Sequence, residues 1–259
     1  MTRPFVGALL GLATYALAAR PAAAVDAFEI QVYEGDINRV GQAGLELHSN
    51  YTASGRTQPA FPGEVVPDGL LRLTLEPSFG VLPWWEVGAY LESATATGDL
   101  AAHWGGFKLR SKFVVPAART TPFVFGANFE IGRGAAALGM ADWEVEVRPI
   151  ATWASGRWSA SVNPILGWTL TGAERSAAPD FEPALKTRVA ATPHIALGVE
   201  YYASLGRVSS PSPWHEQEHY LYAAGDLLNG PIELNLGIGR GLTDASAAWT
   251  IKAIVGRTF

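Results

Sequence analysis

The sequence predicts an all-β fold: a single up-and-down antiparallel transmembrane β-barrel of about twelve strands, with its N- and C-termini periplasmic. Three observations support this prediction. The chain begins with an export signal, it continues in stretches of about ten residues that alternate apolar and polar side chains, and aromatic residues recur ten positions apart within these stretches. Alternation with period two places successive side chains on opposite faces of a strand, and long alternating strands are typical of outer-membrane barrels.

The composition agrees with this fold class. Of the 259 residues, 17% are charged, and glycine is abundant at 28 residues. A typical soluble domain has about 25% charged residues. The formal net charge of -5 provides no basic field for nucleic acid, so we expect no nucleic-acid partner. Cysteine is absent, which excludes disulfides, thiolate metal sites and cysteine nucleophiles.

Residues 1–24 have the three parts of a cleavable signal peptide. Arg3 supplies the positive start, residues 5–19 supply an apolar stretch, and three alanines at 22–24 supply the cleavage site. A membrane anchor is the alternative, but the apolar run is short for a span of about 20 residues. We therefore expect an exported chain with a signal peptide at 1–24, a periplasmic or lumen-plugging segment at 25–40 and a barrel at 41–259.

Twelve alternating segments follow this start. In the second segment, for example, Leu71, Leu73 and Leu75 alternate with polar residues. Long or polar connections alternate with short ones along the chain, as expected for extracellular loops and periplasmic turns. An even number of strands closes the barrel without a free edge. We expect strands at approximately 41–54, 68–82, 84–96, 100–117, 121–137, 141–155, 157–172, 180–193, 194–208, 215–229, 231–242 and 246–259.

Aromatic residues on the apolar faces provide an independent test. Ten residues of a tilted strand cover roughly 25 Å of height, which is the depth of the apolar band of such barrels. A soluble barrel or sandwich has no reason to place tryptophans at this interval on a face meant for water. We therefore predict two belts of membrane-interface aromatics. The outer belt comprises Trp104, Trp143, Trp168 and Trp249, and the inner belt comprises Trp85, Trp153, Trp158 and Phe259.

The final strand, WTIKAIVGRTF (249–259), alternates and ends in an aromatic residue. It resembles the C-terminal signature of Gram-negative outer-membrane β-barrel proteins. This resemblance implies that assembly machinery recognises Phe259 and inserts the chain into outer-membrane lipid. More loosely, FEIQVYEGD (28–36) followed by GLELHSNYT (44–52) is similar to the start of uncharacterised proteobacterial barrels that are grouped with proposed transporters near aromatic-compound degradation genes.

Side chains alternate between the two faces of each strand, and this alternation, which we call strand parity, places many charged side chains inside the barrel. Twelve strands make a barrel roughly 24 Å across, and inward side chains leave a passage of about 10 Å or less. Lys108, Arg110 and Lys112 share one face of one strand, so we expect the flanking strands to supply acids that pair with them. Parity also places Glu182 and Glu233 inside and leaves the inward face of 215–229 open. The predicted lumen charge network comprises Glu46, His48, Arg72, Glu76, Glu86, Glu92, Lys108, Arg110, Lys112, Glu130, Glu144, Glu146, Arg148, Lys186, Arg188, Glu200 and Lys252.

Such a lumen is compatible with two functions. A small pore or passive transporter would use the opposed acidic and basic walls to orient small solutes. A structural or adhesive barrel would have a closed, ion-paired lumen and would act through its extracellular loops.

An outer-membrane hydrolase is the third alternative. Outer-membrane phospholipases and lipid A deacylases, as families, use a His and a Ser two residues apart on one strand face, and none of the five histidines has this neighbour. His215 and His219 match the zinc spacing H-E-x-x-H, but that motif requires a helix, and these residues lie between a Ser/Pro-rich loop and a strand. We therefore predict no catalytic residues, no metal and no cofactor.

Overall fold

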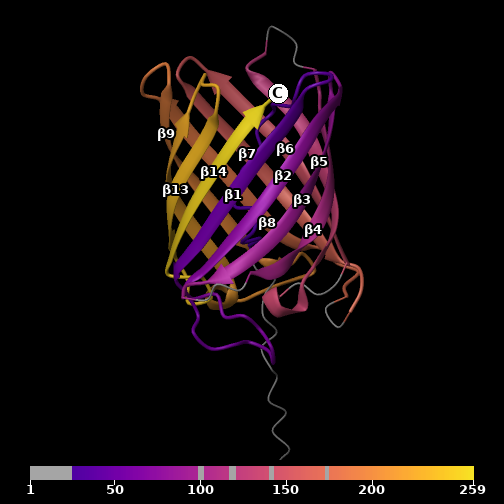
Figure 1. The fold of residues 1–259 in the computed structure, drawn as a ribbon, viewed down its shortest axis with the longest axis vertical. Coiled ribbons are helices and arrows are strands. Elements are labelled where there is room, and N and C mark those ends of the chain that lie inside the picture. The colour runs from indigo at the N-terminus through magenta and orange to yellow at the C-terminus, as the bar shows by residue number, and fades with distance from the viewer. Residues whose placement is uncertain (1–24, 99–101, 117–120, 140–142, 173–174) are drawn as a thin grey trace, which may run out of the picture.

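The computed structural model describes residues 25–98, 102–116, 121–139, 143–172 and 175–259, so the predicted signal peptide 1–24 lies outside the described residues. The chain forms a closed antiparallel barrel of twelve long strands (Figure 1). Each strand pairs with its neighbours along the chain, and the first and last strands pair with each other to complete the ring. The predicted all-β, up-and-down barrel is confirmed.

Every predicted segment contains one barrel strand, and the observed strands are shorter at one or both ends. Two further short strands, β10 (Gly206–Arg207) and β11 (Ser210–Pro211), pair with each other in the loop after β9. The barrel strands are β1 (Ala43–Ser54), β2 (Leu70–Leu82), β3 (Trp85–Ala96), β4 (His103–Val114), β5 (Phe123–Gly134), β6 (Trp143–Ser155), β7 (Trp158–Thr169), β8 (Asp180–Ala190), β9 (Ile195–Ser204), β12 (Glu218–Leu227), β13 (Glu233–Gly241) and β14 (Trp249–Thr258).

Helix is confined to two single 3-10 turns in the described residues. These are η1 (Ala136–Leu138) and η2 (Trp214–Glu216), and both lie in loops. In the described part of the chain, no helix has the length and apolar character that a membrane span requires.

The strands turn their polar side chains inward and their apolar side chains outward. In β2, Arg72, Thr74 and Glu76 are buried, whereas Leu75 and Phe79 are 40% and 46% exposed. This distribution is the inverse of that in a soluble barrel, where the interior is apolar. The continuous ladder around the ring also satisfies the backbone hydrogen bonds of the wall, as a lipid environment requires.

The long loops and the short turns lie at opposite ends of the barrel. The short-turn end holds the start of β1 and the end of β14, and it is at the top in Figure 1, where the C-terminus is marked. The loop that joins β1 to β2 and the turns η1 and η2 lie at the other end, which we call the long-loop end.

Residues 25–40, which we call the N-terminal segment, run through the interior from one end to the other. The Val25 backbone N–H donates to Glu218 Oε2 (3.1 Å) at the long-loop end. Midway, the Tyr33 N–H donates to Asn163 Oδ1 (2.6 Å), and Asn163 Nδ2 donates to the Tyr33 carbonyl (3.0 Å). The Asn38 N–H donates to Glu86 Oε2 (2.6 Å) near the short-turn end. The segment therefore fills the barrel along its length.

This path changes one expectation about the termini. We expected both chain ends on one side, and the ends of the barrel strands do meet, because Gly44 pairs with Thr258. Val25, however, lies beside Glu218 and packs near Tyr220, at the end of the barrel opposite Phe259. A segment that threads the lumen begins at the end away from the strand it leads into. The side of the membrane that each terminus faces stays a prediction.

Candidate functional site

The predicted network residues all project from the inner face of the wall, and most are buried. The half-buried members are Glu46, Lys108, Glu144, Glu146 and Arg188. The buried members are His48, Arg72, Glu76, Glu86, Glu92, Arg110, Lys112, Glu130, Arg148, Lys186, Glu200 and Lys252. Of the two further acids that parity placed inside, Glu182 is half-buried, whereas Glu233 is exposed at the first residue of β13.

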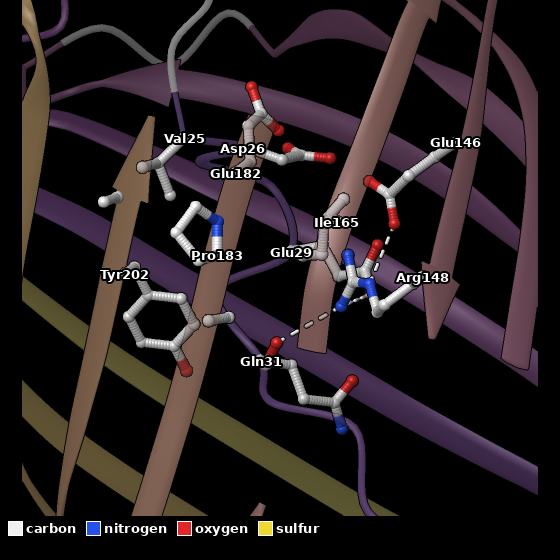
Figure 2. A pocket seen from close by; sticks show the side chains of 12 residues that line it. Val25, Asp26, Glu29, Gln31, Glu146, Arg148, Ile165, Glu182, Pro183 and Tyr202 are labelled. Atoms are coloured by element: carbon white, nitrogen blue, oxygen red, sulfur yellow. Dashed lines mark hydrogen bonds and ion pairs between the residues drawn. The ribbon is translucent and has the colours of Figure 1, made fainter. Parts of the chain in front are cut away.

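One group of ion pairs joins β4, β5 and β6 to the N-terminal segment. Arg148 Nη1 lies 3.1 Å from Glu29 Oε1, and Arg148 Nε lies 2.8 Å from Glu146 Oε1 (Figure 2). Lys108 Nζ pairs with Asp26. It also lies 3.6 Å from a carboxylate of β5. We call this group the Arg148 cluster: Asp26, Glu29, Lys108, Glu130, Glu146 and Arg148.

A second group lies on β8, β9, β12 and β14. Lys186 Nζ lies 2.7 Å from Asp226 Oδ1, and Lys252 Nζ pairs with Glu200. Lys252 Nζ also donates to the Ile30 carbonyl of the N-terminal segment (3.0 Å). The segment adds one carboxylate, Glu34, whose Oε1 lies 3.0 Å from an Arg188 nitrogen. We call this group the Lys252 cluster: Glu34, Lys186, Arg188, Glu200, Asp226 and Lys252.

A third group lies on β1 to β4, nearer the short-turn end. Arg110 Nε donates to Glu76 Oε1 (2.6 Å), and Arg110 Nη2 lies 2.8 Å from Glu86 Oε1. The guanidinium lies over Gly88, where an added Cβ would be 2.8 Å from Arg110 Nε, so a larger residue would displace it. On the other side of Glu76, His48 Nε2 lies 3.0 Å from Glu76 Oε2. We call this group the Arg110 cluster: Glu46, His48, Glu76, Glu86 and Arg110.

The structure brings together most of the pairs expected for the three bases of β4. Arg110 binds Glu86 of the preceding strand, and Lys108 lies near Glu130 of the following strand. Lys112 instead lies 3.8 Å from Asp36 of the N-terminal segment. Glu92 faces Gly106 across the β3–β4 ladder.

Tyr33 of the N-terminal segment lies at the centre of these charges. The Arg148 guanidinium carbon is 4.5 Å from the ring centroid of Tyr33, and Lys112 Nζ is 4.9 Å from it. Cations attract the face of an aromatic ring, more strongly where water is excluded. The Tyr33 hydroxyl also hydrogen-bonds the Tyr90 hydroxyl. Tyr33 thus connects the segment to the basic residues of the wall.

Sequence reasoning missed the acids of the N-terminal segment and one acid of the wall. Asp26, Glu29, Glu34 and Asp36 contact bases of three different strands, and no strand pattern assigned them a face. Asp226 was missed because the inward face of 215–229 was open. Tyr222 is buried and Leu221 is exposed in β12, so the same parity places Asp226 inside.

Very little empty space remains beside Arg148. A cavity of about 20 Å³ is lined by residues that include Glu29, Glu182 and Tyr202 (Figure 2). One water molecule needs about 10–15 Å³ measured in this way. The lumen is therefore nearly filled at this level when the N-terminal segment is inside it.

The predicted interface aromatics lie in two groups at the two ends of the barrel. The long-loop end has Trp104 (59% exposed), Trp143, Trp168 and Trp249 near the ends of their strands. The short-turn end has Trp85, Trp153, Trp158 (57% exposed) and Phe259. Trp85, Trp153 and Trp168 are half-buried against neighbouring side chains on the wall.

His215 and His219 do not share a helix. His215 lies in the turn η2 with its side chain 69% exposed, whereas His219 lies in the strand β12. The His219 ring is 2.6 Å from the Tyr201 hydroxyl and 2.9 Å from Gln217 Oε1. This arrangement differs from the helical H-E-x-x-H zinc motif.

Comparison with known proteins gives no match to a family model and none to a curated protein. Among solved structures, the COG4313 outer membrane channel from Pseudomonas putida F1 has a TM-score of 0.59 at 13% identity, covering 89% of this chain and 100% of that chain. The KdgM porin has a TM-score of 0.57 at 6% identity, covering 83% and 99%. The KdgM porin in complex with disordered oligogalacturonate has a TM-score of 0.52 at 8% identity, covering 84% and 98%. The chain therefore shares the fold of outer-membrane β-barrels.

Proposed function

We propose that this protein is an outer-membrane barrel that acts as a small pore or passive transporter for small solutes. The observation that carries the proposal is the shared fold with two outer-membrane channels over nearly their whole length. The charged inner wall supports it, because charged and polar side chains are typical of the interior of barrels that conduct water-soluble solutes.

The outer surface supports a position in the outer membrane. Exposed leucine, isoleucine, valine and aromatic side chains cover the outward face of the strands, and tryptophans lie towards both ends. We infer that signal peptidase removes residues 1–24 and that assembly machinery recognises the strand ending at Phe259. The short turns then face the periplasm and the long loops face outward.

The N-terminal segment is the part of the molecule that restricts a passage. It forms hydrogen bonds or ion pairs with most strands of the wall, and the cavity that remains beside Arg148 has a volume of about 20 Å³. At the level of Arg148, a solute larger than water passes only if the segment moves or leaves this part of the lumen. We therefore assign the segment the role of a plug.

A reversible cross-link tests this proposal without changing any charged residue. The chain has no cysteine, and a Cβ placed on Gly35 would lie 2.7 Å from Val124 Cβ on β5. A disulfide needs a Cβ–Cβ separation of about 3.5–4.5 Å, so cysteines at these two positions can be joined once the segment shifts from β5 by about 1 Å. Conductance of the double variant Gly35→Cys/Val124→Cys in planar bilayers would be measured before and after reduction. The single variant Val124→Cys is the control.

We expect low conductance in the cross-linked form, recovery on reduction, and a larger conductance when residues 26–36 are deleted. Equal conductance in all forms would assign the passage to another part of the lumen and remove the plug from the proposal. Absence of conductance even without residues 26–36 would contradict the pore itself.

The second candidate is a structural or adhesive barrel with a closed lumen. The nearly filled interior and its dense ion pairs favour this candidate. It predicts no conductance in the parent or in the deletion variant, and it predicts that binding to cells or surfaces depends on the long loops. The same bilayer experiment therefore separates the two candidates.

A further inference from the structure

Three ligand-type side chains meet on the inner wall at the first hairpin of the barrel. Glu46 and His48 are two residues apart on β1 and share its inward face, and Glu46 is paired directly with Glu76 of β2. His48 Nε2 lies 3.0 Å from Glu76 Oε2 and 3.5 Å from Glu46 Oε2. One ligand atom from each residue lies within 4.8 Å of the other two.

The charges around these residues do not balance. Like charges placed directly opposite each other destabilise a strand pair, and Glu46 lies opposite Glu76. Glu76 and Glu86 share the single guanidinium of Arg110, so the Arg110 cluster has three carboxylates and one arginine. Within the cluster, a neutral His48 imidazole leaves two negative charges. Lys112, which faces Glu86 across the β3–β4 ladder and lies 3.8 Å from Asp36, is a further cation of this wall. A divalent cation beside Glu46 and Glu76 would neutralise the negative charge that remains.

The distances from His48 Nε2 to the two carboxylate oxygens also suit a metal ion. Ligands bound about 2.0–2.2 Å from a zinc ion in tetrahedral or octahedral directions lie roughly 3.0–3.5 Å apart. Arg110 holds the other oxygen of Glu76, Oε1, at 2.6 Å, which leaves Oε2 directed towards His48. Outer hydrogen bonds of this kind commonly fix the orientation of metal-binding carboxylates.

We propose that Glu46, His48 and Glu76 form a binding site for one divalent transition-metal ion, such as Zn²⁺, on the inner wall of the β1–β2 hairpin. An imidazole with two carboxylates is a ligand set of zinc and related metals, whereas Ca²⁺ takes six to eight oxygen ligands. The expectation of no metal rested on helical and cysteine motifs, and these three ligands lie on strands.

The site is closed at His48 and Glu76 and more open at Glu46, whose Oε2 also accepts a hydrogen bond from Gln31 Nε2 of the N-terminal segment (3.4 Å). The His48 and Glu76 side chains are 0% and 3% exposed, whereas the Glu46 side chain is 25% exposed. Glu46 therefore provides the entry side, where water or a solute would complete the coordination. The bound ion would join β1 to β2 beside the seam with β14, because His48 also pairs with Ile254.

The competing arrangement is a protonated His48 that donates to both glutamates without any metal. It produces the same distances, so binding has to be measured. The full mature protein would be folded in detergent, stripped with chelator, and titrated with Co²⁺ while its visible absorption is recorded. Zn²⁺ would then compete for the site. The first variants are Glu46→Gln, which changes only the half-exposed ligand, and His48→Gln. The matched control is His219→Gln, which removes the buried histidine of β12.

We expect one equivalent of Co²⁺ with a nitrogen–oxygen coordination spectrum, displaced by Zn²⁺. Affinity should fall at least about tenfold in Glu46→Gln and more in His48→Gln, and should be unchanged in His219→Gln. A second measurement on the parent alone is the unfolding temperature, which one equivalent of Zn²⁺ should raise. The proposal is wrong if the parent binds no stoichiometric metal, or if Glu46→Gln and His219→Gln bind it equally well. If His48→Gln does not fold, the Glu46→Gln comparison decides the matter.

Discussion

The Arg148 cluster and the Lys252 cluster both place basic side chains inside the barrel, but they take different shares of their acids from the N-terminal segment. Lys108 pairs with Asp26 of the N-terminal segment, and Arg148 lies 3.1 Å from Glu29 of the same segment. Lys186 and Lys252 instead pair with Asp226 and Glu200 of the wall. The Arg148 cluster also contains Glu130 and Glu146 of the wall, so two of its four acids come from the segment, against one of three in the Lys252 cluster. The Arg148 cluster therefore depends more strongly on the segment.

This difference indicates how the segment is held. A buried charge that loses its partner costs several kcal/mol, and the cost is smaller where other partners remain. The first half of the segment, which carries Asp26 and Glu29, supplies half of the acids of the Arg148 cluster. The second half interacts with bases that already have acids, apart from Lys112 near Asp36.

The largest expected effect is that of Arg148→Ala. Arg148 is 2% exposed, and its removal leaves Glu29 and Glu146 without their closest cation. We expect a loss of about 3–5 kcal/mol in the free energy of unfolding, measured by urea titration of protein folded in liposomes. Arg188→Ala is the control because its side chain is 23% exposed, and about 1 kcal/mol or less is expected. Equal losses would contradict the comparison.

Substitutions of acids in the N-terminal segment test the same difference between the two clusters, with smaller expected losses of stability. Glu29→Gln removes a charged partner of Arg148, so we expect a loss of about 1.5–3 kcal/mol in the same titration. Glu34→Gln should cost less, about 1 kcal/mol, because Lys186 keeps Asp226 and Glu200. A double-mutant cycle of Glu29 with Arg148 would isolate their coupling energy. If Glu34→Gln cost more than Glu29→Gln, the second half of the N-terminal segment would be the more tightly bound half, contrary to our assignment.

Arg110 extends the comparison to ion selectivity. Its partners Glu76 and Glu86 both belong to the wall. Arg110→Ala removes a positive charge and leaves two carboxylates near the short-turn end. If the barrel conducts, we expect its reversal potential across a salt gradient to shift towards cation selectivity. Arg240→Ala, which removes a charge from an exposed position beside Trp249, should leave the reversal potential unchanged. If Arg110→Ala conducts clearly with an unchanged reversal potential, the permeation path does not pass Arg110.

The smallest effect concerns an ion pair outside the lumen. Its contribution to stability should be smaller than that of the ion pairs in either cluster. In the loop between β1 and β2, Arg56 Nη2 lies 2.6 Å from Glu64 Oε1, and this hydrogen bond lowers the pKa of Glu64. The pair therefore stabilises the folded loop above the ordinary pKa of glutamate and loses this contribution as pH falls through the lowered value. We expect faster proteolysis of this loop in that acidic range, and no such acceleration in Glu64→Gln. Exposed pairs contribute about 0.2–1 kcal/mol, so the change should be modest.

Much of the barrel follows from the sequence because the side-chain period of a strand is two. Once Leu73 is assigned to the lipid side, Arg72 and Thr74 must face inward, and this rule predicted the inner position of the whole charge network. The pairing of Arg110 with Glu86 was also expected, because neighbouring strands bring inward side chains within reach.

The N-terminal segment could not be predicted in the same way. Residues 25–40 form no barrel strand, so no ladder register fixes which side chains they meet. The partner of Lys108 is Asp26, 82 residues away in sequence, and this pair depends on how the segment is threaded. The open face of 215–229 had a simpler cause: tyrosines are common on both faces of a barrel, so Tyr220 and Tyr222 did not decide it.

The position of the segment also has a consequence for the order of folding. The segment hydrogen-bonds both strands of the closing seam: Asn50 of β1 donates to the Phe28 carbonyl, and Lys252 of β14 donates to the Ile30 carbonyl. The second contact joins residues 222 positions apart, and contacts this distant in sequence form slowly because a long loop must close first. A ring that has already closed would require the segment to be threaded lengthwise through a lumen lined by charged side chains. We therefore expect the wall to close around the segment, with β1 carrying it into place before β14 completes the seam.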